Sequence, residues 1–415
     1  MIRRVALTVL AFVVLAGVTV GVSMIAPDRR PASAAVELPR TSSVTCGVEG
    51  EVLAVADSAF TSRSLSGAAG PVGVSPLAAP IEGPTALTSD GRSVAGVLTA
   101  DDERTFLPCA APSTSGVLLV PDPGERELLL INPDSGETVV DLTLLGPDGE
   151  ITAVGARGIA IGPGASRRVA LSVLAPEGPV GVAFEASVGR VAALAVAVEG
   201  RGTRLTAPAV ASDAQVIPGI PGGVSSPRLL ISNPGLDRVT IAVEVLGATG
   251  SYEPASAADQ TIAPLSTLEL DLGDDLGGDP GALRITADGE VAAAVVLDSL
   301  DGPPTTLTAG EESAELAGYG PSGGELQLSN PVLAEVTARL TGATARDVTV
   351  PAGATVAVEV SKTDRSYVTV EATGPLVGAL VSPGEKKQGL AVAPLGVVGT
   401  AEDDSALAVV DPNLR

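Results

Sequence analysis

The sequence predicts an all-β protein: an N-terminal transmembrane helix followed by tandem Ig-like or fibronectin-III-like β-sandwich repeats of about 85–100 residues. Two observations support this fold class. Apolar and polar residues alternate with a period of two between turns rich in Gly and Pro, and one strand pattern recurs along the chain. No stretch outside Val5–Ile25 shows helical periodicity. The alternative is a β-propeller with two blades per repeat, because propeller blades have about 40–50 residues.

The recurring pattern is centred on an Asn-Pro pair. Three of the four asparagines, Asn132, Asn233 and Asn330, follow an apolar run and precede a proline, at spacings of 101 and 97 residues. An alternating strand follows each pair. We interpret the pairs as turn devices, because proline ends a strand and asparagine can bond its own backbone around a bend.

Each copy then continues with further strands. A turn proline opens another alternating strand in each copy: Pro163, Pro264 and Pro351. A glycine in the next stretch predicts a β-hairpin, because glycine reaches positive φ at little steric cost: Gly189, Gly289 and Gly374. With an opening and a closing strand, each copy has about seven strands. The sequence around Gly91 matches the last part of the pattern, which predicts a divergent or partial fourth copy.

These patterns divide the chain into a series of segments. They are a cytoplasmic N-terminus (1–4), the apolar segment (5–25), a linker (26–44), the divergent or partial β repeat (45–112), three β-sandwich repeats (113–210, 211–310 and 311–398) and a C-terminal tail (399–415).

The apolar segment Val5–Ile25 predicts export. It carries no charge and is long enough to span a bilayer as a helix. Arg3 and Arg4 precede it, which places the N-terminus in the cytoplasm and the remaining chain outside. We expect a single-pass protein of the cell membrane with an extracytoplasmic C-terminal region. Secretion after signal cleavage is the alternative, since Ala32-Ser33-Ala34 has the form of a cleavage site.

Composition excludes several classes of function. The chain has no His, which removes Ser-His-Asp and Cys-His nucleophile systems, His-ligated metals and a His general base. The formal net charge of −24 excludes a basic surface for nucleic acid or anionic lipid. Cys46 and Cys109 lie on the predicted exported side without CxxC or metal-ligand spacing, so we expect a structural disulfide between them.

Two motifs suggest chemistry, and both have a simpler explanation. Loop carboxylates can hold Ca²⁺, and the densest acidic cluster comprises Asp271, Asp274, Asp275 and Asp279. Its spacing does not match a calcium loop and the other copies have no counterpart, so we interpret it as a solvated loop insertion. Glycines 318, 320 and 323 match G-x-G-x-x-G, but the motif leads into a strand and offers no helix N-terminus for a phosphate.

Carboxylate pairs for glycoside hydrolysis are numerous among 49 acidic residues, and no pair is singled out. Glu269 and Asp271 occupy outward positions of a predicted strand. Sugar binding by aromatic stacking has few candidate residues, since the chain has no Trp and only three Tyr and four Phe. The sequence therefore predicts no catalytic, cofactor-binding or metal-binding residue.

The combined pattern resembles a family of exported actinobacterial proteins of unknown function. The resemblance covers about residues 45–398. It is carried by LLLINP or LLISNP, a following V-x-V-x-V strand, a P-G-type turn and G-x-V-x-A before the closing strand, together with the apolar N-terminal segment and Cys109 ahead of Ala-Pro. The sequence departs from the family where an aromatic pair is expected, at Ser113-Thr114-Ser115. The resemblance implies location and fold, and it supplies no catalytic residues.

These observations favour a non-enzymatic structural or accessory protein of the actinobacterial cell envelope that acts through protein–protein contacts. Its expected partner is an envelope or membrane protein, for example a membrane enzyme that builds cell-wall glycan. The first alternative is a polysaccharide- or solute-binding module, and the second is a carboxylate-based hydrolase. We expect no cofactor, no metal and no nucleic acid.

Overall fold

The computed structural model describes residues 41–398, except for 66–69, 71, 100–104, 125, 176, 200–201, 225, 277, 299–303, 362–364 and 384–389. These residues belong to one compact unit, Arg40–Ala401. The predicted membrane segment Val5–Ile25 and the tail 399–415 lie outside the described residues. Within the described part of the chain, no helix is long and apolar enough to cross a membrane.

Repeat 1 (residues 113–210) shows the structural unit. Its opening sheet has the strand order β11–β10–β14–β8, with β12 also paired to β10, and its closing sheet has the order β13–β9–β15–β16. The elements are β8 (Ser115–Val120), β9 (Arg126–Ile131), β10 (Thr138–Gly146), β11 (Gly149–Ile151), β12 (Ile159–Ile161), β13 (Ser166–Ala170), α2 (Leu171–Leu174), β14 (Val180–Val188), β15 (Ala192–Glu199) and β16 (Gly202–Thr206).

Repeats 2 and 3 have the same strand order. Repeat 2 (211–310) comprises β17 (Ser212–Ile220), β18 (Arg228–Asn233), β19 (Val239–Leu246), β20 (Ser251–Tyr252), η1 (Ala255–Ala257), β21 (Gln260–Ile262), β22 (Ser266–Asp271), η2 (Gly273–Leu276), β23 (Gly281–Leu297) and β24 (Thr305–Thr308). Repeat 3 (311–398) comprises β25 (Ser313–Pro321), β26 (Glu325–Ser329), β27 (Val336–Gly342), β28 (Arg346–Val350), β29 (Thr355–Glu359), β30 (Arg365–Pro383) and β31 (Leu390–Pro394).

The N-terminal region, here called repeat N (41–112), follows this order as well. Its opening sheet has the order β3–β5–β1, which corresponds to β10–β14–β8 of repeat 1, and its closing sheet has the order β4–β2–β6–β7. Its strands are β1 (Thr41–Cys46), β2 (Gly50–Ala56), β3 (Thr61–Ser64), β4 (Leu77–Ile81), β5 (Thr85–Asp90), β6 (Ser93–Leu98) and β7 (Phe106–Pro108).

The predicted glycine hairpins are wrong. In repeat 2, Ala282–Ala287 of β23 pairs with β19, whereas Ala292–Val296 of the same strand pairs with β18 in the other sheet. The chain at Gly289 therefore continues from one sheet into the next without folding back on itself. β30 does the same at Gly374, and β14 and β15 join different sheets on either side of Gly189. A sheet change and a hairpin give the same alternating sequence, so the pattern could not separate them.

The two sheets of each repeat face one another over a shared apolar core. In repeat 1, the core takes Leu128 and Leu130 from the closing sheet and Leu142 and Leu144 from the opening sheet. The period-two pattern of each strand thus places one face inside the repeat. The prediction of an all-β fold is confirmed, and each repeat has the sandwich-like pairing of sheets that the sequence predicts.

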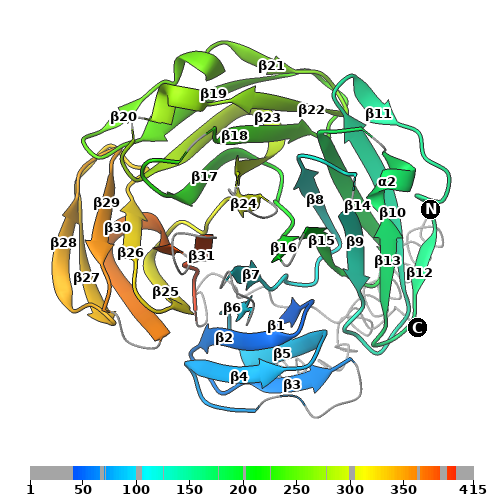
Figure 1. Ribbon diagram of the computed structural model, residues 1–415, viewed down its shortest axis with the longest axis horizontal. Coiled ribbons are helices and arrows are strands. Elements are labelled where there is room, and N and C mark those ends of the chain that lie inside the picture. The colour runs from blue at the N-terminus through cyan, green and yellow to red at the C-terminus, as the bar shows by residue number, and fades with distance from the viewer. Residues whose placement is uncertain are drawn as a thin grey trace, which may run out of the picture. The chain divides into compact units, whose positions relative to one another are not determined.

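The outer face of each opening sheet packs against the closing sheet of the next repeat. Leu119 and Leu145 of repeat 1 contact Leu230 and Val296 of repeat 2 in one such cluster. Repeat 2 contacts repeat 3 through a cluster of the same kind. Repeat N contacts repeat 1 through Leu107, Ala110 and the residues that follow β1 and β3, Val48 and Leu65. A further cluster joins repeat 3 to Leu53 and the neighbouring strands of repeat N. The sheets therefore follow one another around a common centre, with β7, β16, β24 and β31 nearest to it (Figure 1). This arrangement is β-propeller-like, as in the alternative that the sequence allowed.

The segment after each closing strand returns to the opening strand of its own repeat. Backbone hydrogen bonds join Thr45 to Ala110, Val117 to Ala209, Val216 to Gly310, and Ala317 to Gly396, at 2.8–3.0 Å. In repeat N the Cys46–Cys109 disulfide lies directly beside this contact, with a Cα–Cα distance of 4.3 Å. The predicted disulfide is confirmed, and it fixes the same two segments that the other repeats join by hydrogen bonds alone.

Candidate functional site

The Asn-Pro pairs form buried turn networks. Asn132, Asn233 and Asn330 have no exposed surface. The Asn233 side-chain amide donates to the Asp237 carbonyl oxygen at 2.7 Å and to the Ala263 carbonyl oxygen at 3.1 Å, and its side-chain oxygen accepts from the Gly235 N–H at 2.9 Å. The other two asparagines make the corresponding bonds. The interpretation of these pairs as turn devices is confirmed.

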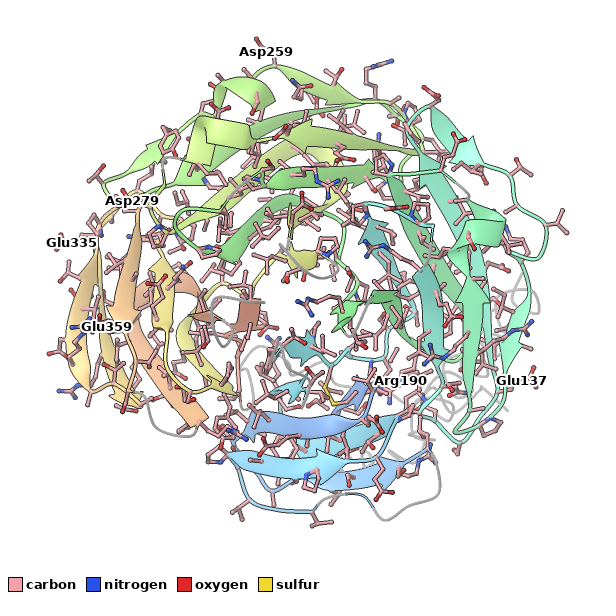
Figure 2. All side chains as sticks on the ribbon, in the orientation of Figure 1. Glu137, Arg190, Asp259, Asp279, Glu335 and Glu359 are labelled. Atoms are coloured by element: carbon pink, nitrogen blue, oxygen red, sulfur yellow. A yellow bond between two sulfur atoms is a disulfide. The ribbon has the colours of Figure 1, made fainter. Side chains whose placement is uncertain are left out.

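Two carboxylates of the acidic loop of repeat 2 accept hydrogen bonds from backbone N–H groups of the same repeat. Asp271 accepts from the Gly273 N–H and Asp275 from the Ser256 N–H, both at 2.9 Å. The Ser256 hydrogen bond holds the pKa of Asp275 below its usual value. Asp279 lies beside Tyr252 at the periphery of the repeat (Figure 2). No group of carboxylates within the described residues is arranged to hold a metal ion, and the side chain of Asp274 lies outside them.

The other two motifs have structural roles. Gly318 and Gly320 lie in β25, where a Cβ would approach Leu395 Cδ2 to 2.3 Å and Ala393 Cβ to 3.2 Å, and the chain enters strand β26 after them. Glu269 accepts a 2.8 Å hydrogen bond from Arg228, which also donates to Asp298. These pairs hold neighbouring strands of the closing sheet together.

A cavity lies where repeats N, 1 and 3 meet, and we call it the junction cavity. Its volume is about 1,100 Å³. Charged side chains of all three repeats line it: Glu49, Glu51, Glu82, Arg168 and Arg365. Leu98, Leu107 and Val196 give it apolar walls. None of the described residues that line it is aromatic.

Two ion pairs position the cations of the junction cavity. Arg365 of β30 pairs with Glu51 of β2, so this contact joins repeat 3 to repeat N. Arg168 of β13 pairs with Glu127 on the adjacent strand β9 at 2.7 Å. Gly47 of repeat N allows repeats N and 1 to approach each other, because a Cβ at this position would lie 2.7 Å from Leu194 Cδ1 of repeat 1. Glu49 and Glu82 stay exposed, so the site offers both signs of charge to a ligand.

A second cavity of about 480 Å³ lies between repeats 1 and 2, and we call it the interrepeat cavity. Asp141 of β10 and Glu185 of β14 are directly opposite each other in the opening sheet of repeat 1. Glu290 of repeat 2 and Arg157 also line it. Neither cavity is predictable from the sequence, because each is formed by residues of different repeats that have no common motif.

The described residues expose few aromatic rings and many carboxylates. Tyr252, at 40%, is the most exposed aromatic side chain, and Phe60, Phe106 and Phe184 are buried. Acidic side chains such as Asp259, Glu335 and Glu359 lie around the periphery (Figure 2). This surface matches the net charge of −24 and offers little for stacking against sugar rings.

The fold and site define an acidic, all-β repeat protein with a propeller-like arrangement and open cavities between its repeats. The model of a family of unknown function, DUF5719, matches residues 88–317, more than half of the chain, so the protein belongs to this family. The match extends from β5 of repeat N to β25 of repeat 3. No curated protein and no solved structure shows a significant match.

Proposed function

We propose that this protein is a non-enzymatic, extracytoplasmic accessory protein of the actinobacterial cell envelope, and that it binds an envelope or membrane protein at the junction cavity. The apolar N-terminal segment and the disulfide support export. The junction cavity is the observation that carries the proposal, because it is large, open and shared by three repeats, so that a bound partner contacts all three at once.

The lining of the junction cavity favours a polypeptide over a glycan. Arg168, Arg365 and three glutamates supply donors and acceptors for the polar groups and charges of a protein segment. Carbohydrate sites usually add aromatic rings for stacking, and the lining has none. A polysaccharide- or solute-binding module is therefore the second candidate.

Site-specific photocrosslinking in cells tests this proposal. A benzophenone amino acid replaces Glu82 at the exposed rim of the junction cavity, and in a matched control it replaces the exposed Glu335 at the periphery of repeat 3. We expect one membrane or envelope protein to crosslink at position 82 and not at 335. Identical adducts at both positions, or none at 82, would contradict the proposal. Crosslinking to cell-wall glycan alone at position 82 would support the binding module instead.

A further inference from the structure

Arginines close two of the contacts between repeats in the same way. Arg284 of repeat 2 donates from Nη1 to the carbonyl oxygen of Pro331 in repeat 3 at 2.6 Å, and from Nε to Glu244 at 2.6 Å. Arg63 of repeat N donates to the carbonyl oxygen of Pro133 in repeat 1. In both cases the acceptor is the proline of the Asn-Pro pair of the following repeat. The guanidinium thus fills the space between two repeats and satisfies the backbone oxygen of a buried proline.

Among the residues that the structure describes, the contact between repeats 1 and 2 has no such arginine. Glu244 follows Asn233 by eleven residues, and Thr143 follows Asn132 by the same spacing. Glu244 lies opposite Arg284 in the sheet, whereas Thr143 lies opposite Ala183. A glutamate–arginine pair is therefore replaced by a hydroxyl and a methyl group. Because these side chains are short, the volume that Arg284 occupies at the next contact remains open here as the interrepeat cavity.

The interrepeat cavity keeps the acceptor that an arginine would use. Pro234, the counterpart of Pro133 and Pro331, lines it. Within the described residues, no backbone N–H donates to the Pro234 carbonyl oxygen. Val117, Leu145 and Leu265 form apolar walls that suit the methylene stem of a long cationic side chain.

The charge of the interrepeat cavity also favours a cation. Asp141, Glu185 and Glu290 contribute three carboxylates, and Asp141 uses one oxygen to accept from the Gly158 N–H at 2.6 Å. Arg157, the one cation among the described lining residues, has Glu150 at 3.7 Å. Within the described residues, no ion pair as close as that between Arg157 and Glu150 is formed by Asp141, Glu185 or Glu290.

We propose that the interrepeat cavity is a receptor for an arginine side chain of a partner polypeptide. The guanidinium donates to the Pro234 carbonyl oxygen and to the carboxylates of Asp141 and Glu185, in the manner of Arg284 at the neighbouring contact. Arginine is favoured over lysine, because its planar fork can donate to a backbone oxygen and a carboxylate together. This site is separate from the junction cavity and does not depend on the function proposed for it.

Binding of a small probe to the full-length protein tests the proposal. N-acetyl-arginine methylamide is titrated by NMR, with the citrulline analogue as an uncharged isosteric control. We expect a dissociation constant on the order of 1 mM for the arginine probe at low salt, and at least a tenfold weaker response to citrulline. Affinity falls several-fold in 0.5 M salt, since the carboxylates are partly exposed. Equal binding of both probes, or no binding of arginine at 20 mM, overturns the proposal.

Two variants locate the binding. Thr143→Glu combined with Ala183→Arg installs the pair of the neighbouring contact, and we expect it to abolish probe binding by filling the cavity. Glu185→Gln changes only an exposed carboxylate, and it should weaken binding by three- to tenfold without altering the fold. The control is Glu359→Gln, at the periphery of repeat 3. Unchanged affinity in Glu185→Gln, or the same loss in the control, would contradict the assignment. Crosslinking through position 82 is independent of these results, so failure of one proposal is distinguishable from failure of the other.

Discussion

Thr267 provides a sharp test of how neighbouring repeats are held together. Its side chain lies in the contact between repeats 1 and 2 and is 2% exposed. The hydroxyl donates to the Leu145 carbonyl oxygen at 2.7 Å and accepts from the Gly181 N–H at 2.9 Å. The Ser232 hydroxyl lies 2.7 Å away. One side chain thus satisfies polar groups on both sides of the contact.

Thr267→Val keeps the shape of this side chain and removes its hydrogen bonds. A buried polar group left without a partner costs about 1–3 kcal/mol. The Gly181 N–H and the Leu145 carbonyl oxygen both lose their bond, and Gly181 has no room to move, since even a Cβ would lie 2.2 Å from Ser232 Oγ. We therefore expect the variant to lower the free energy of unfolding by about 2–4 kcal/mol.

Urea unfolding of the full-length protein measures this loss, and hydrogen exchange at the Gly181 amide locates it. The exposed Thr261→Val is the matched control, with an expected change within about 0.5 kcal/mol. Thr355→Val should reproduce the loss between repeats 2 and 3, because its hydroxyl donates to the Leu246 carbonyl oxygen at 2.7 Å. A Thr267→Val variant as stable as the control, with unchanged protection of Gly181, would show that the Thr267 hydroxyl does not hold repeats 1 and 2 together.

Three further predictions concern other parts of the fold. Asn233→Ala removes the hydrogen bonds of a buried side-chain amide to three backbone groups. We expect urea unfolding to show that the free energy of unfolding falls by about 2–4 kcal/mol, and a fall below about 1 kcal/mol would contradict the turn role. Replacing Cys46 and Cys109 by Ser should cost roughly 4 kcal/mol on the chain-entropy model, measured against the oxidised protein, and equal stability would exclude a structural disulfide. Hydrogen bonds from Arg190 hold the pKa of Asp134 below its usual value, partly opposed by burial. This pair therefore stabilises the fold above about pH 4 and loses that effect as the pH falls further. Because both side chains are more than a third exposed, Asp134→Asn should cost less than about 1 kcal/mol at pH 7 and nothing near pH 2, and a cost that grows on acidification would contradict the assignment.

The local features of this fold were predictable from the sequence. Each Asn-Pro turn depends on residues within 30 positions of one another, and its signal recurs three times. Strand alternation indicates which side chains face the interior of a repeat, and it does not depend on contacts with the next repeat. The two cysteines could be paired because the chain contains no others.

The remaining features depend on contacts between repeats, which leave no local pattern. Gly289 lies in a strand that passes from one sheet to the next, and the residues around it alternate in the same way as those of a hairpin. Glu51 and Arg365 are more than 300 residues apart, so no spacing rule connects them. The interrepeat cavity results from the short side chains of Thr143 and Ala183, which lie where the next repeat has Glu244 and Arg284. This correspondence depends on the strand pairing of both repeats.

The four repeats lie around a common centre, with repeat 3 in contact with repeat N. Small-angle neutron scattering of the full-length protein in contrast-matched detergent tests this directly. A compact chain of this length has a radius of gyration of about 22 Å, whereas four separate domains in line would give roughly 37 Å. We predict a value below about 27 Å, unchanged by salt. A value above about 33 Å would show that the repeats form an extended string and do not lie around a common centre.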